Sequence, residues 1–139
     1  MTSKVVYLGD LRTECTHIQS GKKIITDAPT DNHGKGEAFS PTDLLATSLA
    51  SCMMTIIGIY CKNHEINFHS CSADIEKIMG ANPRKVDKII VNMDFTGNDW
   101  DDSTLQKVIQ TAKNCPVAKT IEDSVNIDFN YRNGTKRDI

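Results

Sequence analysis

Two cysteines stand where a thiol could become reactive. Cys52 lies mid-way along an apolar, helix-forming stretch, and Cys115 directly precedes Pro116 at the start of another predicted helix. A cysteine at a helix N-cap faces free backbone amides and the positive end of the helix dipole, which lower its pKa below about 8.5. Both residues also have a structural interpretation, Cys52 as a small buried apolar side chain and Cys115 as the cap of a turn. The sequence is therefore compatible both with a reactive thiol site and with two structural cysteines.

The remaining three cysteines are interpreted as structural. Cys15 and Cys71 fall on predicted strands, and Cys61 lies at the end of the helix that carries Cys52. At 100° per residue, the nine positions between Cys52 and Cys61 turn the helix by about 180°. Cys61 therefore cannot share a site on the face of Cys52.

Other site chemistries have less support. The four histidines are scattered, and Cys61 with His64 would supply two of the four ligands that a structural zinc needs. The chain has no Gly-x-Ser-x-Gly motif, and Gly34-Lys35-Gly36 is not followed by the residues of a phosphate-binding loop. We therefore expect neither a metal nor a cofactor.

The helix that carries Cys52 has the clearest boundary in the chain. Ser40 suits the N-cap and Pro41 the first helical position, while Asp43 can accept the Ser40 amide as Ser40 caps the Asp43 amide. The helix is expected to run to about Asn63. This arrangement predicts a capping box.

The apolar part of this helix is long enough to raise the question of a membrane. Eighteen uncharged residues run from Leu44 to Cys61, near the lower limit of a spanning helix. Four of them carry hydroxyl groups, and no basic cluster flanks the segment. We therefore expect a core helix, buried on nearly all sides, and no membrane association.

Strands and shorter helices surround this central helix. Three strands are predicted before it, over Lys4–Leu8, Thr13–Ile18 and Lys22–Thr26, followed by a polar loop that starts at Asp27. After it come an antiparallel pair over His69–Ile78 and Lys88–Phe95, helices over Leu105–Lys113 and from Cys115-Pro116 to Ile121, a strand over Val125–Arg132, and a polar tail from Asn133. This order predicts a single α+β domain over residues 1–139.

Composition narrows the class of protein. The chain has 139 residues, is 39% hydrophobic and 24% charged, and carries a net charge of −2. These values are ordinary for a globular protein and do not suggest a nucleic-acid partner. The first residues lack the apolar core of a signal peptide, and five cysteines in that context suggest cytoplasmic thiols.

Two motifs carry a resemblance to a known family. Ser40-Pro41-Thr42-Asp43-Leu44-Leu45 running into Ala50-Ser51-Cys52, with Asn114-Cys115-Pro116-Val117 further on, resembles the OsmC/Ohr family of thiol peroxidases. The resemblance implies the OsmC/Ohr fold, an intertwined homodimer, and a cofactor-free enzyme that reduces organic hydroperoxides with electrons from a dithiol. It also implies that Cys52 is the peroxidatic thiolate and Cys115 the resolving cysteine.

The resemblance extends to the groups that would activate the thiol. The family uses an Arg from the N-terminal strands, for which Arg12 is the candidate, although it could equally be a solvated strand residue. The family's Glu falls on Thr42, so Glu37 or Asp43 would have to supply the acid. This departure leaves an alternative open: a non-catalytic relative that binds a small apolar or thiol ligand in the dimer pocket.

The same resemblance suggests an apolar substrate site. Phe39, Leu45, Leu49 and Met53 could line it and accept an alkyl tail, although each could serve simply as a core residue.

Overall fold

The computed structural model describes residues 1–134; positions 135–139, in the predicted polar tail, lie outside the described residues. The chain divides into two compact units, Met1–Leu45 and a second that begins at Ala46. The elements are those of an α+β protein, as predicted, and they follow the expected chain order.

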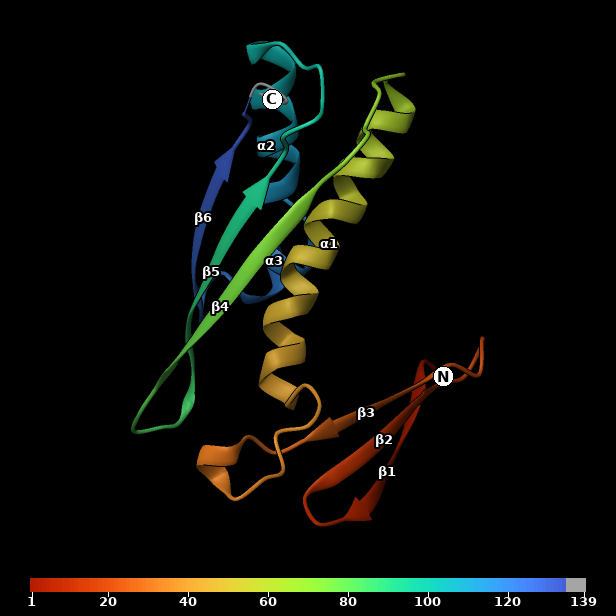
Figure 1. Ribbon diagram of the computed structural model, residues 1–139, viewed down its shortest axis with the longest axis vertical. Coiled ribbons are helices and arrows are strands. Elements are labelled where there is room, and N and C mark those ends of the chain that lie inside the picture. Colours follow the sequence, from red (N-terminus) through yellow and green to blue (C-terminus); the bar gives the residue numbers. More distant parts are fainter. Residues whose placement is uncertain (135–139) are drawn as a thin grey trace. The chain divides into compact units, whose positions relative to one another are not determined.

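The first unit is a three-stranded antiparallel sheet and a loop. Strands β1 (Ser3–Gly9), β2 (Arg12–His17) and β3 (Lys23–Asp27) pair in chain order (Figure 1). A short 3₁₀ turn over Thr30–Asn32, which the sequence did not predict, interrupts the loop that follows. Apolar side chains on these strands and directly beside them are exposed; they are Val5, Val6, Tyr7, Leu8, Leu11, Ile18 and Ile24. This sheet has almost no core of its own.

Helix α1 (Pro41–Asn63) begins with the predicted capping box. The Ser40 amide donates to Asp43 Oδ2 at 2.9 Å, and the Asp43 amide donates to Ser40 Oγ at 3.0 Å. Two amides that the first turn would otherwise leave without partners are thereby satisfied. The start of the helix is fixed by local sequence.

The second unit is a sheet covered on one face by helices. Strands β4 (Ser72–Gly80) and β5 (Lys85–Asp94) form the predicted antiparallel pair, and β6 (Asn126–Arg132) lies parallel to β5. Helices α2 (Asp102–Lys113) and α3 (Pro116–Ile121) make the crossover from β5 to β6 (Figure 1). A parallel neighbour requires such a crossover, so the chain order and the sheet order agree.

The core of this unit lies between β5 and the helices. Alternate residues of β5 face inward, and α1 and α2 contribute their apolar stripes to the same cluster. Its fully buried members include Leu49, Met53, Ile57, Ile89, Val91 and Val108. Helix α1 is therefore the core helix of the second unit.

A single chain buries only part of α1. The helix meets length and composition criteria for crossing a membrane, as the core helix of a globular protein also can, but only 33% of its most apolar window is buried in one chain. Ser51, Thr55 and Ile59 lie exposed along one side, and a Cβ added at Gly58 would meet no atom within 4 Å. A single chain covers the sheet-facing side of α1 and leaves this second side open.

Strand β4 starts three residues later than the alternating pattern predicted. The buried side chain of Asn98 bonds to the backbone at this point. Its Oδ1 accepts a hydrogen bond from the His69 amide at 2.7 Å, and its Nδ2 donates to the Ser70 carbonyl at 2.7 Å. Because these backbone groups bond to a side chain, they do not join the ladder.

Candidate functional site

The side chains of Cys52 and Cys115 are neighbours in the second unit, close enough for Cys52 to contribute to the raised pKa of Cys115. Cys52 is half-buried on α1, whereas Cys115 is fully buried at the N-cap of α3. Pro41 and Pro116 occupy the first positions of the two helices, so local sequence determines where each helix starts. The fold thus brings together two thiols that lie far apart in the chain.

The environment of Cys115 raises its pKa, contrary to the expectation from its N-cap position. Cys115 Sγ accepts the Ala118 amide at 3.4 Å, and the Ala118 and Val117 amides do favour the thiolate. Loss of water on burial acts more strongly in the opposite direction, and the neighbouring Cys52 adds to it. The sequence showed the cap but not the burial, and the predicted sign was wrong.

The other three cysteines lie apart from this pair. Cys15 is on β2 in the first unit, and its sulfur lies 3.9 Å from Thr13 Oγ1. Burial raises the pKa of Cys61, and burial together with Asp94 raises the pKa of Cys71 to about 11. At neutral pH these last two thiols are protonated and unreactive.

Arg12 is held by two carboxylates of the first unit. Its Nε donates to Asp27 Oδ1 at 2.7 Å and its Nη2 to Asp27 Oδ2 at 2.9 Å, which makes a bidentate pair. The same Nη2 donates to Glu37 Oε1 at 3.0 Å. Arg12 is therefore a fixed, half-buried cation and not a freely solvated strand residue.

Asp27 is the residue that the sequence did not single out. It occupies the end of β3, directly opposite Arg12 on β2 in the strand register. Its side chain is fully buried, and hydrogen bonds from Arg12 and from the Glu37 amide hold the pKa of its carboxyl below the ordinary value despite burial. Only the β2–β3 register, which cannot be read from composition, would have revealed this pairing.

The two acids that were predicted have different surroundings. Glu37 bonds to Arg12, with a side chain that is 70% exposed. Asp43 is engaged in the capping box of α1 through Oδ2. Thr42, where the resemblance implies an acid, has its Oγ1 3.3 Å from Ser40 Oγ.

The four apolar residues considered for a substrate site fall into two groups. In the first unit, Phe39 and Leu45 are exposed. In the second unit, Leu49 and Met53 are fully buried in the core. The second pair is needed for packing whatever the function.

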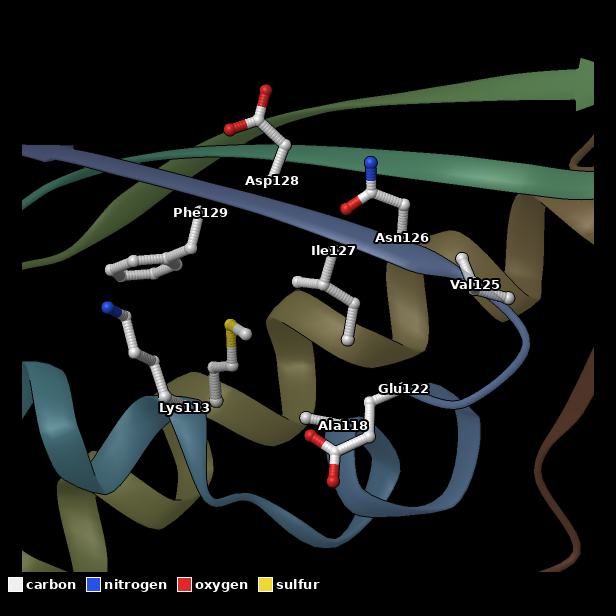
Figure 2. A pocket seen from close by; sticks show the side chains of 9 residues that line it. Lys113, Ala118, Glu122, Val125, Asn126, Ile127, Asp128 and Phe129 are labelled. Atoms are coloured by element: carbon white, nitrogen blue, oxygen red, sulfur yellow. The ribbon is translucent and has the colours of Figure 1, made fainter.

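The second unit has a cavity of about 550 Å³ between the helices and β6. Figure 2 shows the Lys113 side chain directed toward the Phe129 ring, with the amine 6.0 Å from the ring centroid, and the Glu122 carboxylate on the opposite wall. Neither Cys52 nor Cys115 lines this cavity. Within residues 1–134, no three His, Cys, Asp or Glu side chains cluster as metal ligands would.

Comparison with known proteins places the chain in a family. The family described as OsmC-like protein matches residues 34–130, more than half of the chain. No curated protein matches the chain significantly.

Solved structures show the same fold over nearly the whole chain. A protein from Psychrobacter arcticus, provisionally named an osmotic stress induced and detoxification response protein, is 51% identical, with 95% of this chain and 96% of that chain covered and a TM-score of 0.90. An organic hydroperoxide resistance protein OsmC from Legionella pneumophila is 19% identical over 94% and 96% of the two chains, with a TM-score of 0.73. An OsmC-like protein from Mycoplasma pneumoniae is 15% identical over 97% and 96%, with a TM-score of 0.77. The chain therefore belongs to the OsmC-like protein family.

Proposed function

We propose that this protein is a thiol peroxidase that reduces organic hydroperoxides through Cys52 and Cys115. The observation that supports it most is the proximity of the two thiols, which is close enough for Cys52 to contribute to the raised pKa of Cys115. A cysteine that becomes a sulfenic acid needs a second thiol within reach to form a disulfide, and Cys115 is the thiol that neighbours Cys52.

The proposed cycle balances with a dithiol as reductant. The Cys52 thiolate attacks the hydroperoxide O–O bond, takes one oxygen as a sulfenic acid, and releases an alkoxide that is protonated to the alcohol. Cys115 then attacks the Cys52 sulfur; the S–O bond breaks, and hydroxide leaves with the Cys115 proton as water. A dithiol reduces the resulting disulfide by two thiol–disulfide exchanges and becomes oxidised itself.

The protonation state of Cys115 disfavours it as the thiolate that attacks the peroxide. Burial raises its pKa, so at neutral pH its thiol keeps the proton. Cys52 is the more exposed of the two, which gives it the first contact with a peroxide. These differences favour Cys52 as the nucleophile that attacks the peroxide.

We assign Arg12 the role of the cation that stabilises the reacting thiolate. The assignment comes from family membership, and it is supported by the fixed geometry of the guanidinium between Asp27 and Glu37. A fixed guanidinium favours a thiolate over a thiol.

The proposal includes a cytoplasmic homodimer, in which each chain is one OsmC-like domain over residues 1–139. The first unit exposes seven large apolar side chains on and beside its sheet, and α1 has an open side at Gly58 and Ile59. Apolar surface of this extent is typical of an interface. A second copy of the chain is the proposed cover.

Thr42 in place of the family's Glu supports a second candidate. In that case the protein binds a small apolar or thiol ligand without turnover, and Cys52 reacts slowly with peroxide. The rate of Cys52 oxidation separates the two functions.

Cumene hydroperoxide with dithiothreitol as reductant tests the peroxidase proposal. The wild-type protein should consume peroxide catalytically, and Cys52→Ser should not. Cys71→Ser is the matched control, because the Cys71 pKa of about 11 leaves that thiol protonated. Peroxide loss no faster than in buffer, or full turnover by Cys52→Ser, would reject the proposal.

A further inference from the structure

Arg12 meets two carboxylates of very different character. The Asp27 side chain has no exposed surface and binds both Nε and Nη2, whereas the Glu37 side chain is 70% exposed and binds Nη2 alone. A bidentate contact to a buried carboxylate fixes both the position and the plane of a guanidinium. A single contact to an exposed carboxylate is weakened by solvent and by salt.

From this geometry we propose that Asp27 is the positioning residue for Arg12, in the role that the family gives to the acid missing at Thr42. The inference rests on the proposed function, because it explains how Arg12 would be held in place to act. Glu37 then contributes a secondary, solvent-screened contact, and Asp43 caps α1.

The pattern of donors on Arg12 supports this assignment. Nε and Nη2 are occupied by Asp27 and Glu37, while within residues 1–134 Nη1 donates no hydrogen bond. The carboxylates therefore hold one side of the guanidinium and leave Nη1 available for an anionic partner.

Asp27 also holds the loop that carries Glu37. Its Oδ2 accepts the Glu37 amide at 3.1 Å, and its own amide donates to the Phe39 carbonyl at 3.1 Å. Because the side chain of Asp27 receives hydrogen bonds from both Arg12 and this loop, it can order the two together. Within residues 1–134 the Glu37 side chain bonds to Arg12 and to no second segment, so it does not link Arg12 to the loop as Asp27 does.

An Asn at position 27 would remove half of the bidentate contact. An amide has one acceptor oxygen, and its NH₂ group would face an N–H of Arg12 instead of accepting from it. The variant also removes the negative charge next to the guanidinium. Asp27→Asn therefore changes the orientation of Arg12 with little change in side-chain volume.

The experiment compares variants by two rates. Cys52 oxidation by cumene hydroperoxide is followed in single turnover, and Cys52 alkylation by iodoacetamide is followed as a function of pH with the modified peptide mapped by mass. The variants are Asp27→Asn, Glu37→Gln, Arg12→Ala and the double variant Arg12→Ala with Asp27→Asn. Asp94→Asn is the matched control, because Asp94 is paired with Arg132 on the second sheet.

The proposal predicts a specific pattern. Asp27→Asn should slow oxidation at least about tenfold and move the alkylation midpoint to higher pH, close to the value for Arg12→Ala. The double variant should be no slower than Arg12→Ala, because Asp27 acts through Arg12. Glu37→Gln should lose less than about threefold, and Asp94→Asn should not differ from wild type.

Three results would overturn it. These are a folded Asp27→Asn protein with wild-type rates and midpoint, losses that multiply in the double variant, and a larger loss for Glu37→Gln than for Asp27→Asn. A wild-type protein that does not react with peroxide would reject the proposed function, whereas the alkylation midpoint would still test Asp27.

A measurement on the wild-type protein covers the case in which Asp27→Asn does not fold. The Arg12 Nε–H should exchange with solvent much more slowly than the Arg132 Nε–H, including in 0.5 M salt, since Arg132 binds Asp94 through Nη2. Equal exchange rates would show that Asp27 does not hold Arg12 and would overturn the inference.

Discussion

The thiols of Cys52 and Cys115 lie close enough to interact, although one lies on the central helix α1 and the other caps α3. Both belong to the second unit, whose core contains both helices. Their contact therefore depends on packing within one compact body. It provides for disulfide formation if either cysteine is oxidised.

Cys115→Ser should separate the two halves of the proposed cycle. Serine is a preferred N-cap, and its Oγ can accept the Ala118 amide as Cys115 Sγ does, so α3 should be preserved. One equivalent of peroxide should still be reduced, and the Cys52 sulfenic acid should persist long enough to be trapped by dimedone. Steady-state turnover with dithiothreitol should fall at least about tenfold. Unchanged turnover would contradict a resolving role.

Alkaline pH should destabilise the folded protein through its buried thiols. The pKa of Cys71 is raised to about 11 in the fold, so between about pH 9 and 11 the unfolded chain loses the Cys71 proton while the folded chain keeps it. The free energy of unfolding must therefore fall across this window. Cys71→Ser should show a shallower fall in urea unfolding measured at each pH. An identical slope in both proteins would contradict the burial of Cys71.

Acid should destabilise the fold through Asp94. Hydrogen bonds from Arg132 and Thr96 hold the pKa of Asp94 well below its ordinary value. Below about pH 4 Asp94 takes up a proton in the unfolded chain but stays ionised in the folded protein. The free energy of unfolding therefore falls as the pH drops. Asp94→Asn should lose stability at pH 7 and depend less on pH between 4 and 2. Urea unfolding of both proteins at pH 7 and between pH 4 and 2 measures these free energies. An equal dependence of the free energy of unfolding on pH in the two proteins would contradict the prediction.

The capping box should matter for stability and not for chemistry. Ser40→Ala removes the acceptor for the Asp43 amide and should cost about 1 kcal/mol of unfolding free energy. The rate of Cys52 oxidation by peroxide should stay within about twofold of wild type, since Asp43 caps the helix and is not the proposed acid partner of Arg12. Denaturant unfolding and single-turnover kinetics test the two parts. A much slower oxidation in a stable variant would reopen a role for Asp43.

Local signals made much of the fold predictable. The start of α1 follows from Ser40, Pro41 and Asp43, and α3 begins at Pro116 as the sequence indicates. The β4–β5 pair follows from alternation and a turn at Asn82-Pro83. In each case neighbouring residues alone determine the structure.

What escaped prediction depends on tertiary structure. The Arg12–Asp27 pair needs the β2–β3 register, and Asp27 looked like the first residue of a polar loop. The sign of the Cys115 pKa shift needs its burial, which comes from packing in the second unit. Neither of these can be read from spacing or composition.

The most direct test of the central proposal is a disulfide map of the reduced protein after one equivalent of cumene hydroperoxide. We expect a disulfide between Cys52 and Cys115 in most of the molecules within a single turnover, while Cys15, Cys61 and Cys71 remain thiols. A protein whose five thiols all survive the peroxide, or whose Cys52 is joined to a cysteine other than Cys115, would contradict it.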